Sequence, residues 1–479
     1  MKLNRLFGID SEKEISHLIL DSRTQTEQGL FFCLEGLTVD GHKYTQSAID
    51  NGCVAIVHHK ELDSYQEGIE YILVDDTMDE LHRVSNVFFD TPSRKMVMNT
   101  ITGTNGKSTV MKTLRNILLR LGVNAGYIGT ISVEYNDYIF SPSLTTPDIV
   151  ELQGILNDMV NEGVEEVCLE VSSQGLSLRR VDAIHFDDAS FTNLSHDHLD
   201  YHKTMEEYFK AKKILFDRLD DEAFTIINAD DEYGRRLIEE GYPHLKTYGI
   251  AQSADYRAKD LVIGEYGTQF TLVHEGQEYP VETNFIADFN VYNVLNVIAI
   301  LHEKGYGFDR ILPELVDIEH VDGRLNRVDE GQDFKVFVDF GHAPDSMANV
   351  FKYVRSITPK ENKMICVFGA AGARDTLKRP MMGKVATEMC DHVIITEHDN
   401  RNEEVVDITK DIVSGVVGDN WEFVPIRIDA IRKAIEMAQP GDSVVLNGKG
   451  EEKFIYRAFG KEDWMGDEVA ASKILKGEL

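Results

Sequence analysis

The stretch MVMNTITGTNGKSTVMKTLRNILLRL, residues 96–121, contains an apolar run, a glycine-rich loop and an amphipathic segment in that order. Residues 96–101 predict a β-strand, and residues 107–121 predict a helix because apolar side chains recur at helical spacing. The apolar face of this helix comprises Val110, Leu114, Ile117 and Leu118. A strand, a glycine loop and a helix in succession are the context that a phosphate-binding loop requires.

The loop itself supplies the groups that bind a nucleotide phosphate. It consists of Gly103, Thr104, Asn105, Gly106, Lys107, Ser108 and Thr109. Its glycines let successive backbone N–H groups face one anion, and the following helix adds its positive N-terminal end. Lys107 offers a charge to the β/γ-phosphates, and the Ser108 hydroxyl can hold Mg²⁺. The spacing from Gly103 is shorter than in the general G-x-x-x-x-G-K-[ST] pattern, so a chance Gly-Lys-Ser turn is the alternative, which the flanking strand and helix disfavour.

The rest of the chain predicts a multidomain α/β protein. Its 479 residues correspond to about three domains at about 150 residues each. Short β-rich runs alternate with helical patterns almost throughout, which is typical of parallel sheets covered by helices. Turns at 90–93 and 321–324 suggest boundaries, so we expect domains at residues 1–92, 93–322 and 323–479.

Composition excludes several classes of function. The formal net charge of −33 disfavours a nucleic-acid partner, although it also simply keeps a protein soluble. The five cysteines are scattered without metal-ligand spacing, so we expect buried reduced thiols in a cytoplasmic protein. The first residues lack the apolar core of a signal peptide, and no run approaches about 18 apolar residues. We therefore expect no membrane insertion, and we expect a monomer.

A histidine-rich segment follows the middle of the chain. Residues 195–202 read SHDHLDYH, with three histidines and two aspartates in eight residues. Such side chains bind metals, but no second cluster with Cys or HExxH spacing accompanies them. Metal contact by one of these histidines and a hydrogen-bonded loop without metal both remain open.

Two further positions suggest chemistry. Glu170 follows the apolar run Val167–Leu169, at the end of a strand where α/β sheets bind ligands, although an ordinary exposed carboxylate is the alternative. Residues 208–216 predict an amphipathic helix that carries Lys212 on its apolar side. A lysine in that position needs a partner or a modification, unless its stem simply lets the ammonium reach solvent.

These residues, with other short motifs, resemble the Mur ligase family, and within it the MurE subfamily. The motifs keep the order that they have in the family and cover nearly the whole chain. They are DSR at 21–23, DGH at 40–42, GTNGKST at 103–109, LTTPD at 144–148, EVSS at 170–173, FTNL at 191–194, DHLDYH at 197–202, FNVYN at 289–293, GR at 323–324 and VDFGHAPD at 338–345.

The resemblance implies a fold as well as a set of ATP-binding residues. The implied fold has three domains: a central P-loop ATPase-type parallel sheet, an N-terminal uridine-nucleotide domain and a C-terminal Rossmann-like ligase domain that binds the amino acid. Lys107 is implied to bind phosphates, and Lys212 to be carbamylated. The implied metal ligands are Ser108, Glu170, His198 and the carbamate of Lys212. The implied adenine and nucleotide contacts are Asn290, Asn293, Arg324 and Asp339.

The resemblance also implies the reaction. It is an ATP- and Mg²⁺-dependent ligation, through an acyl phosphate, of a diamino acid to UDP-N-acetylmuramoyl-L-alanyl-D-glutamate in peptidoglycan precursor synthesis. The residues implied to hold the two substrates are Ser22, Thr145, Thr146, Ser172, Arg180, Arg374, Arg401 and Glu452. Folylpolyglutamate synthase shares the ATP core but leaves the segment 21–42 without a purpose. A non-catalytic nucleotide switch needs only the glycine loop and leaves Glu170, His198 and Lys212 unexplained.

Departures from the family pattern concern the amino acid. MurE often has Tyr-Ala where this chain has Phe340-Gly341, GKGHE becomes GKGEE at 448–452, and DNPR aligns to HDNR at 398–401. Arg374 matches the residue that holds the α-carboxylate, and Arg401 the one that grips the second carboxylate of meso-diaminopimelate. Acidic residues in this region suit the ammonium of L-lysine instead; they are Asp399, Glu403, Glu404, Glu451 and Glu452. We expect diaminopimelate ahead of lysine, with a surface pair of Arg401 with Glu403 or Glu404 as the alternative.

Overall fold

The structure is a computed structural model that describes residues 1–479 except 37–38, 320, 322 and 451. The chain forms two compact units. The first comprises residues 1–100 and 123–187, and the second comprises residues 101–122 and 188–479. Asp322, which ends the predicted central domain, lies outside the described residues.

The N-terminal part of the first unit is a small parallel sheet. Its four strands are ordered β1-β2-β3-β4, and each neighbouring pair is parallel. These strands are His17–Ile19, Gly29–Phe32, Cys53–His58 and Glu70–Leu73, and the helices of this part are α1 (Leu3–Phe7), η1 (Gly41–Tyr44), α2 (Thr45–Asp50), α3 (Thr77–Phe89) and η2 (Pro92–Arg94). Phe31, Ile56 and Cys53 lie in its core, as expected for parallel strands that are covered by helices.

An eleven-stranded sheet runs in the order β15-β14-β13-β12-β11-β10-β5-β9-β6-β7-β8. Strands β10, β11 and β12 are parallel to one another, as are β6 and β9, whereas the hairpins at both ends are antiparallel. The strands are β5 (Val97–Thr102), β6 (Ala125–Ile128), β7 (Val133–Tyr135), β8 (Tyr138–Phe140), β9 (Glu166–Glu170), β10 (Asp188–Phe191), β11 (Phe224–Asn228), β12 (Leu245–Gly249), β13 (Tyr256–Ile263), β14 (Thr268–His274) and β15 (Gln277–Thr283).

The helices that accompany this sheet are α4 (Lys107–Arg120), α5 (Ile149–Asn161), α6 (Ser173–Ser177), α7 (Leu199–His202), α8 (Met205–Asp217), α9 (Glu232–Glu240), α10 (Asp288–Glu303), α11 (Phe308–Ile311) and η3 (Leu312–Leu315). Two of them are predicted from the sequence: α4 begins at the predicted Lys107, and α8 begins at Met205, three residues before the predicted start. Helix α4 buries the predicted apolar face and ends one residue before Leu121. Strand β5 begins and ends one residue later than predicted. Helix α8 starts after the N-cap Thr204, whose hydroxyl accepts from Glu207 N–H.

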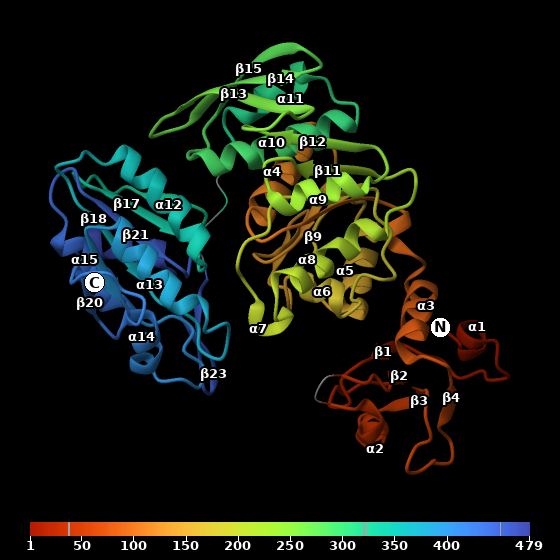
Figure 1. The fold of residues 1–479 in the computed structure, drawn as a ribbon. Coiled ribbons are helices and arrows are strands. Elements are labelled where there is room, and N and C mark those ends of the chain that lie inside the picture. Colours follow the sequence, from red (N-terminus) through yellow and green to blue (C-terminus); the bar gives the residue numbers. More distant parts are fainter. Residues whose placement is uncertain (37–38, 320, 322, 451) are drawn as a thin grey trace. The chain divides into compact units, whose positions relative to one another are not determined.

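The C-terminal part of the second unit is a six-stranded sheet, ordered β16-β17-β21-β18-β19-β20. Figure 1 labels strands β17, β18, β20 and β21 of this sheet among the helices of this part. Along β18, Met364, Cys366 and Phe368 belong to one core, and Ile365 and Val367 belong to another, because neighbouring side chains of a strand point to opposite faces. Helices α12, α13 and α14 cover the first face, and α15 and α16 cover the second. A sheet with helices on both faces has the Rossmann-like character that the family resemblance implies.

The bounds of these C-terminal elements are as follows. The strands are β16 (Asn326–Val328), β17 (Lys335–Asp339), β18 (Met364–Phe368), β19 (His392–Ile395), β20 (Trp421–Phe423) and β21 (Ser443–Asn447), with a separate hairpin of β22 (Phe454–Arg457) and β23 (Gly460–Asp463). The helices are α12 (Pro344–Ile357), α13 (Lys378–Met389), α14 (Val405–Val413), α15 (Arg427–Met437) and α16 (Asp467–Leu475).

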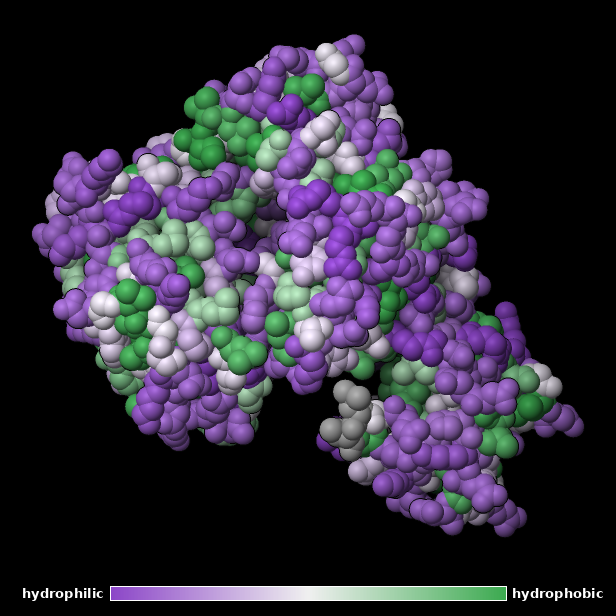
Figure 2. Space-filling model, in the orientation of Figure 1, coloured by the Kyte–Doolittle hydropathy of each residue, from purple (hydrophilic) through white to green (hydrophobic). Residues whose placement is uncertain are grey.

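The surface is mainly hydrophilic on the face that Figure 2 shows. Among the described helices, none combines the length and the apolar character needed to cross a bilayer. All five cysteines are buried and free, as the sequence predicts.

Candidate active site

The glycine-rich loop lies between β5 and α4 in a conformation that only glycine tolerates well. Gly106 caps α4 with φ +90°, and no side chain caps the first turn of the helix. At Gly103 a Cβ atom would lie 1.8 Å from the Thr192 hydroxyl oxygen. The loop backbone is therefore tightly packed, and it leads directly into the N-terminal end of α4, whose positive dipole favours an anion.

Residues of the FTNL motif hold this loop, a role that the sequence did not assign to them. The Thr192 hydroxyl donates to Asn105 O at 2.7 Å, and Asn193 exchanges hydrogen bonds with the N–H and C=O of Asn105. Thr104 N–H donates to Asn193 O at 2.8 Å. These bonds come from the segment that follows β10, and β10 is the strand next to β5 in the sheet.

Both predicted lysines reach the loop. Lys107 Nζ donates to the carbonyl oxygens of Gly103 and Thr104, at 2.9 Å each. Lys212 is 2% exposed, and its Nζ donates to Gly103 O at 2.7 Å. The alternative in which Lys212 extends to solvent is therefore wrong.

The environment of Lys212 disfavours an ammonium. Its hydrogen-bond acceptor is the carbonyl of Gly103 rather than a carboxylate, and the Tyr208 ring, 4.7 Å from Nζ, offers only a cation–π contact in place of a counter-ion. Burial, followed by the charge of Lys107, lowers the pKa of Lys212 well below its usual value. A neutral amine is the form that attacks carbon dioxide, so this site suits the predicted modification.

The histidine-rich segment is organised around Asp197. This buried carboxylate accepts from Lys378 Nζ at 3.0 Å, and the Nε2 atoms of His198 and His342 each lie 3.6 Å from it. His198 has φ +56°, and its side chain is 46% exposed. The described residues contain no group of three or more His, Cys, Asp or Glu side chains arranged to hold a metal. Lys378 is not identified from the sequence as the partner of Asp197, because Lys378 lies far from it in the sequence and belongs to no recognised motif.

The predicted adenine and nucleotide contacts are ordered by their own hydrogen bonds. Asn290 and Asn293 are buried on α10, and Asn293 Nδ2 donates to Asn290 Oδ1 at 2.8 Å. A Cβ on Gly106 would meet Asn293 Oδ1 at 2.5 Å, so α10 lies against the phosphate loop.

Arg324 and Asp339 differ in what they offer a ligand. Arg324 stacks on Phe340, and its Nη2 lies 3.4 Å from the Ser108 hydroxyl. Arg324 and Ser108, which are both predicted to contact the nucleotide or its metal, therefore lie side by side. Asp339 accepts from the backbone N–H groups of Leu325 and Gly341, and burial raises its pKa. The carboxylate of Asp339 therefore orders the segment that carries Arg324.

The first unit contains Glu170, which is a predicted metal ligand, and several residues that are predicted to hold a substrate. Glu170 is fully buried, so the interpretation as an exposed strand-end carboxylate is wrong. Its Oε1 accepts from the Tyr127 hydroxyl and from Thr130 N–H, and its Oε2 accepts from the Thr130 hydroxyl at 3.0 Å. Tyr127 and Thr130 have no motif signal that could have identified them.

Four residues that are predicted to hold a substrate lie close together beside the end of β9. The Thr146 hydroxyl donates to Glu170 O at 3.1 Å and accepts from Ser172 N–H at 2.9 Å. Arg180 donates to Thr146 O, and Thr145 lies 3.2 Å from the Thr130 hydroxyl. Ser22 is separate from this group, in the small N-terminal sheet region, where its carbonyl accepts from Ser47 and Asn51.

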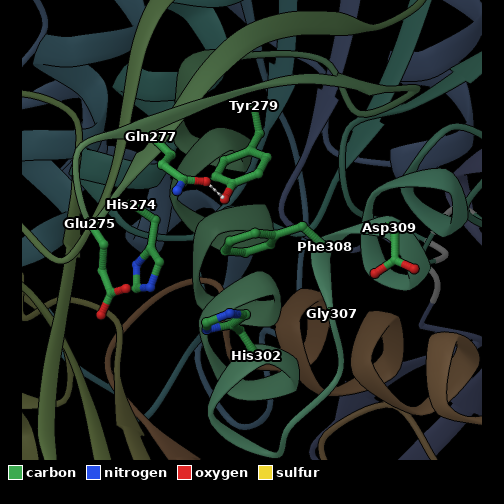
Figure 3. A pocket seen from close by; sticks show the side chains of 8 residues that line it. All are labelled: His274, Glu275, Gln277, Tyr279, His302, Gly307, Phe308 and Asp309. Atoms are coloured by element: carbon green, nitrogen blue, oxygen red, sulfur yellow. Dashed lines mark hydrogen bonds between the residues drawn. The ribbon is translucent and has the colours of Figure 1, made fainter.

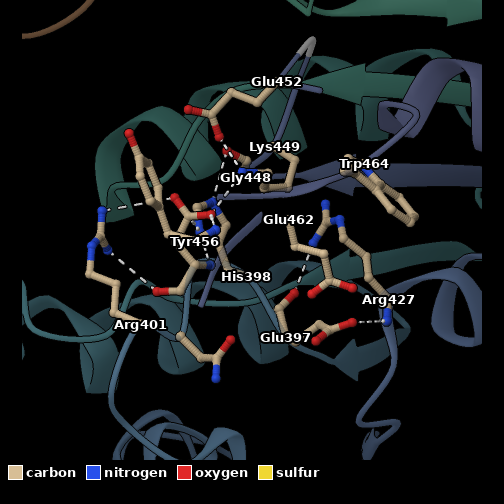
Figure 4. Close-up of polar contacts among 12 residues, drawn as sticks. Glu397, His398, Arg401, Arg427, Gly448, Lys449, Glu452, Tyr456, Glu462 and Trp464 are labelled. Atoms are coloured by element: carbon tan, nitrogen blue, oxygen red, sulfur yellow. Dashed lines mark hydrogen bonds and ion pairs between the residues drawn. The ribbon is translucent and has the colours of Figure 1, made fainter. Parts of the chain in front are cut away.

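The region predicted to bind the amino acid is a dense polar network (Figure 4). Lys449 is fully buried and pairs with Asp399 at 2.9 Å and with Glu452. His398 Nδ1 accepts from Asp399 N–H, so its Nε2 carries the proton and donates to Gly448 O at 3.1 Å. Burial, followed by the charge of Lys449, keeps the pKa of His398 well below its usual value, so this side chain is neutral.

Arg401 binds main-chain groups instead of a neighbouring glutamate. Its Nη1 donates to Gly372 O at 3.0 Å and to Asp399 O at 3.3 Å, and its guanidinium lies 5.1 Å from the Tyr456 ring centre. Glu403 pairs with Arg379. Among the ion pairs of the described residues, Arg401 has Asp399 as its partner at 4.0 Å and neither Glu403 nor Glu404, so the alternative of a surface pair with one of these glutamates is not supported. Glu451, which we counted among the acidic residues here, lies outside the described residues.

A cavity of about 400 Å³ lies elsewhere in the second unit, between β14, β15 and the ends of α10 and α11 (Figure 3). Its lining residues are His274, Glu275, Gln277, Tyr279, His302, Gly307, Phe308 and Asp309. None of these is a predicted site residue.

Three family models match consecutive parts of the chain. They are the Mur ligase family catalytic domain at residues 14–103, the Mur ligase middle domain at 101–301 and the Mur ligase glutamate ligase domain at 323–450. The chain belongs to the Mur ligase family. The resemblance seen in the sequence motifs is thus confirmed, together with the three-part fold.

Individual Mur ligases match over almost the full length. A Clostridium acetobutylicum protein named UDP-N-acetylmuramoyl-L-alanyl-D-glutamate–2,6-diaminopimelate ligase 1 is 38% identical, with 95% of each chain covered. A solved structure of a ligase with the same name, without the final numeral, is 25% identical, has a TM-score of 0.69 and covers 100% of this chain and 99% of its own. MurF from Thermotoga maritima, solved with ADP, has a TM-score of 0.67 at 18% identity, covers 97% of this chain and 98% of its own, and shows the shared fold.

Proposed function

We propose that this Mur ligase uses ATP and Mg²⁺ to join a diamino acid to UDP-N-acetylmuramoyl-L-alanyl-D-glutamate in peptidoglycan precursor synthesis. The observation that carries the proposal is the buried Lys212, whose Nζ reaches Gly103 O of the phosphate loop. A nucleotide switch has no use for such a lysine. The names of the full-length relatives support the substrate, and the match to the N-terminal model over residues 14–103 disfavours folylpolyglutamate synthesis.

The donor atoms fit Mg²⁺, which prefers oxygen ligands and usually keeps waters and substrate phosphates in its coordination shell. The proposed oxygen ligands are the Ser108 hydroxyl, the Glu170 carboxylate and a Lys212 carbamate, and the family resemblance adds the ring nitrogen of His198. Bound Mg²⁺ would neutralise phosphate charge during transfer. Lys107 and Arg324 supply positive charge from the protein, and Asn290 and Asn293 are proposed to face the adenine.

The proposed chemistry makes a carboxylate into an acyl donor. The terminal carboxylate of the dipeptide attacks the γ-phosphorus of ATP, and ADP leaves, which produces an acyl phosphate. The amine of the incoming amino acid then attacks the acyl carbon, loses a proton and expels phosphate, so that an amide forms. Thr145, Thr146, Ser172 and Arg180 are proposed to hold the peptide part of the acceptor, and Ser22 the uridine part.

The amino acid is proposed to be meso-diaminopimelate. Burial, followed by the positive charge of Arg374, lowers the pKa of Arg401, because each disfavours the charged guanidinium. Arg401 donates to carbonyl oxygens and lies 4.0 Å from Asp399, which Lys449 already pairs. An incoming carboxylate would relieve the repulsion between the two guanidinium groups, whereas the terminal ammonium of lysine would add to it. The Glu452 carboxylate is proposed to accept from an ammonium group of the same ligand.

The test measures phosphate release with ATP, the UDP-muramoyl dipeptide and either amino acid. We expect release to require all three substrates, which separates a ligase from a nucleotide switch. Wild type should prefer diaminopimelate by several kcal/mol, which is at least about 100-fold in kcat/KM, and Arg401→Ala should remove the preference. If wild type prefers lysine and the substitution changes nothing, the assignment of the amino acid is wrong.

A second test concerns the phosphate loop. Lys107→Ala should lower kcat by about 10² to 10³, because it removes one cation from the transferring phosphate. The far-ultraviolet circular dichroism and the unfolding midpoint should stay close to those of wild type. An enzyme with wild-type turnover after this change would end the assignment of the ATP site.

We propose that the protein acts as a monomer in the cytoplasm, where reduced thiols persist. Size-exclusion chromatography with light scattering tests the monomer, and fractionation of cells tests the location.

A further inference from the structure

The Glu170 carboxylate is bonded unequally at its two oxygens. Oε1 accepts from the Tyr127 hydroxyl and, at 3.3 Å, from Thr130 N–H, whereas Oε2 accepts from the Thr130 hydroxyl at 3.0 Å. All three donors are neutral. They orient the carboxylate without cancelling its charge, which a lysine or arginine partner would do.

The sheet fixes the partner of Oε1. Tyr127 is fully buried on β6, which pairs with β9 in parallel register, with Tyr127 opposite Cys168 and Ile128 opposite Leu169. Gly129 leaves room for the contact, since a Cβ there would lie 2.3 Å from Glu170 Oε1 and 2.4 Å from the Tyr127 hydroxyl oxygen. Two buried side chains on neighbouring strands have little freedom to separate.

The partner of Oε2 can change. A threonine hydroxyl carries one proton, which rotates to suit its surroundings. The Thr130 hydroxyl lies 3.2 Å from the Thr145 hydroxyl, and Thr130 is exposed. Thr130 can therefore donate either to Glu170 or to Thr145, and turning to Thr145 leaves Oε2 without this donor.

We propose that Tyr127 is a positioning residue that holds Oε1 of Glu170, so that Oε2 is the oxygen offered to a divalent cation, and that the Thr130 hydroxyl turns its proton from Oε2 to Thr145 in the cation-bound state. The inference rests on the proposed function, in which Glu170 is a cation ligand and Thr145 contacts the acceptor. A Thr145 hydroxyl that accepts from Thr130 directs its own proton elsewhere, toward an acceptor oxygen. Cation binding and acceptor binding are thereby coupled through one hydroxyl.

The first experiment uses Mn²⁺ as the probe, titrated calorimetrically into the full-length protein with ADP. Tyr127→Phe should weaken Mn²⁺ binding by about 10-fold, as the loss of groups that orient metal ligands commonly does. The KM for Mg²⁺ should rise by a similar factor, with kcat at saturating Mg²⁺ changed much less. The matched control is Tyr135→Phe, a buried tyrosine on the neighbouring strand β7, which should bind Mn²⁺ like wild type.

The second experiment measures the coupling. In wild type, Mn²⁺ should tighten binding of the UDP-muramoyl dipeptide, and in Thr130→Val this tightening should be lost. Because Thr130 is exposed, this variant should keep the fold even if Tyr127→Phe does not. Wild-type coupling in Thr130→Val, or wild-type Mn²⁺ affinity in folded Tyr127→Phe, would overturn the inference.

Glu170→Gln separates the two levels of the proposal. If it binds Mn²⁺ as wild type does, Glu170 is not a ligand and the proposed function fails at this residue. If it loses Mn²⁺ while Tyr127→Phe retains it, Glu170 is a ligand and only the positioning role is wrong.

Discussion

At the scale of one residue, the burial of Lys212 lowers the stability of the fold near pH 7 and leaves the side chain as a reactive, neutral amine. Unfolded lysine has a pKa of about 10.4, and burial lowers the pKa of Lys212 well below that value in the folded protein. Between the two pKa values the unfolded state binds more protons, so stability rises with pH in that range. Lys212→Met should abolish ligation, raise the free energy of unfolding near pH 7 and flatten its rise toward pH 10. Urea titrations at several pH values measure both changes.

The neighbouring lysine supplies the control. Lys213 pairs with Asp217 and Glu240, and hydrogen bonds to these carboxylates raise its pKa despite partial burial. Lys213→Met should leave ligation intact and should not raise stability at pH 7. Carbon NMR after addition of labelled bicarbonate should show a carbamate in wild type that is absent from Lys212→Met. An active, fully liganded enzyme without that signal would contradict the modification.

At the scale of an element, helix α4 tests what its N-terminal glycine contributes. Gly106 and Gly122 flank the helix with φ +90° and +89°, so an alanine is strained by about 1–2 kcal/mol at either position. Only at Gly106 would the new Cβ meet another group, Asn293 Oδ1 at 2.5 Å, whereas nothing lies within 4 Å at Gly122. Gly106→Ala should therefore lose more stability than Gly122→Ala, and ADP affinity as well.

Urea unfolding with and without ADP measures this difference. ADP should stabilise wild type and Gly122→Ala to the same extent, and Gly106→Ala much less, since a ligand stabilises only the state that binds it. Equal losses of stability and of ADP affinity in the two variants would show that the packing of Gly106 against α10 is unimportant.

At the scale of the whole molecule, one ion pair joins segments 181 residues apart within the second unit. Asp197 and Lys378 are both buried, and their Oδ1 and Nζ atoms lie 3.0 Å apart. Removing one partner of a buried pair leaves an unpaired charge and costs about 3–5 kcal/mol. Lys378→Met should lower the free energy of unfolding by about this amount, and a urea titration should show it as a lower midpoint of the first unfolding transition. Lys384→Met, on the same helix α13 but 59% exposed, should change stability by no more than about 0.5 kcal/mol. Equal effects of both substitutions would contradict a stabilising role for the pair.

The sequence by itself determined the local features and the family of this protein. The phosphate loop, helix α4 and the apolar face of α8 follow from residue types and spacing within about 15 positions, because turn and helix formation depend on near neighbours. The order of the motifs identified a Mur ligase because that order spans the chain and is not produced by chance at so many positions.

Tertiary structure alone decided which distant groups meet. The pairing of β6 with β9 brings Tyr127 to Glu170, and Asp197 finds Lys378 across 181 positions. Arg401 takes carbonyl partners, although two glutamates lie within three residues of it in the sequence. Such contacts depend on strand order and on which side chains a core leaves room for. Local periodicity carries no information about either, so these partners could not be predicted from the sequence.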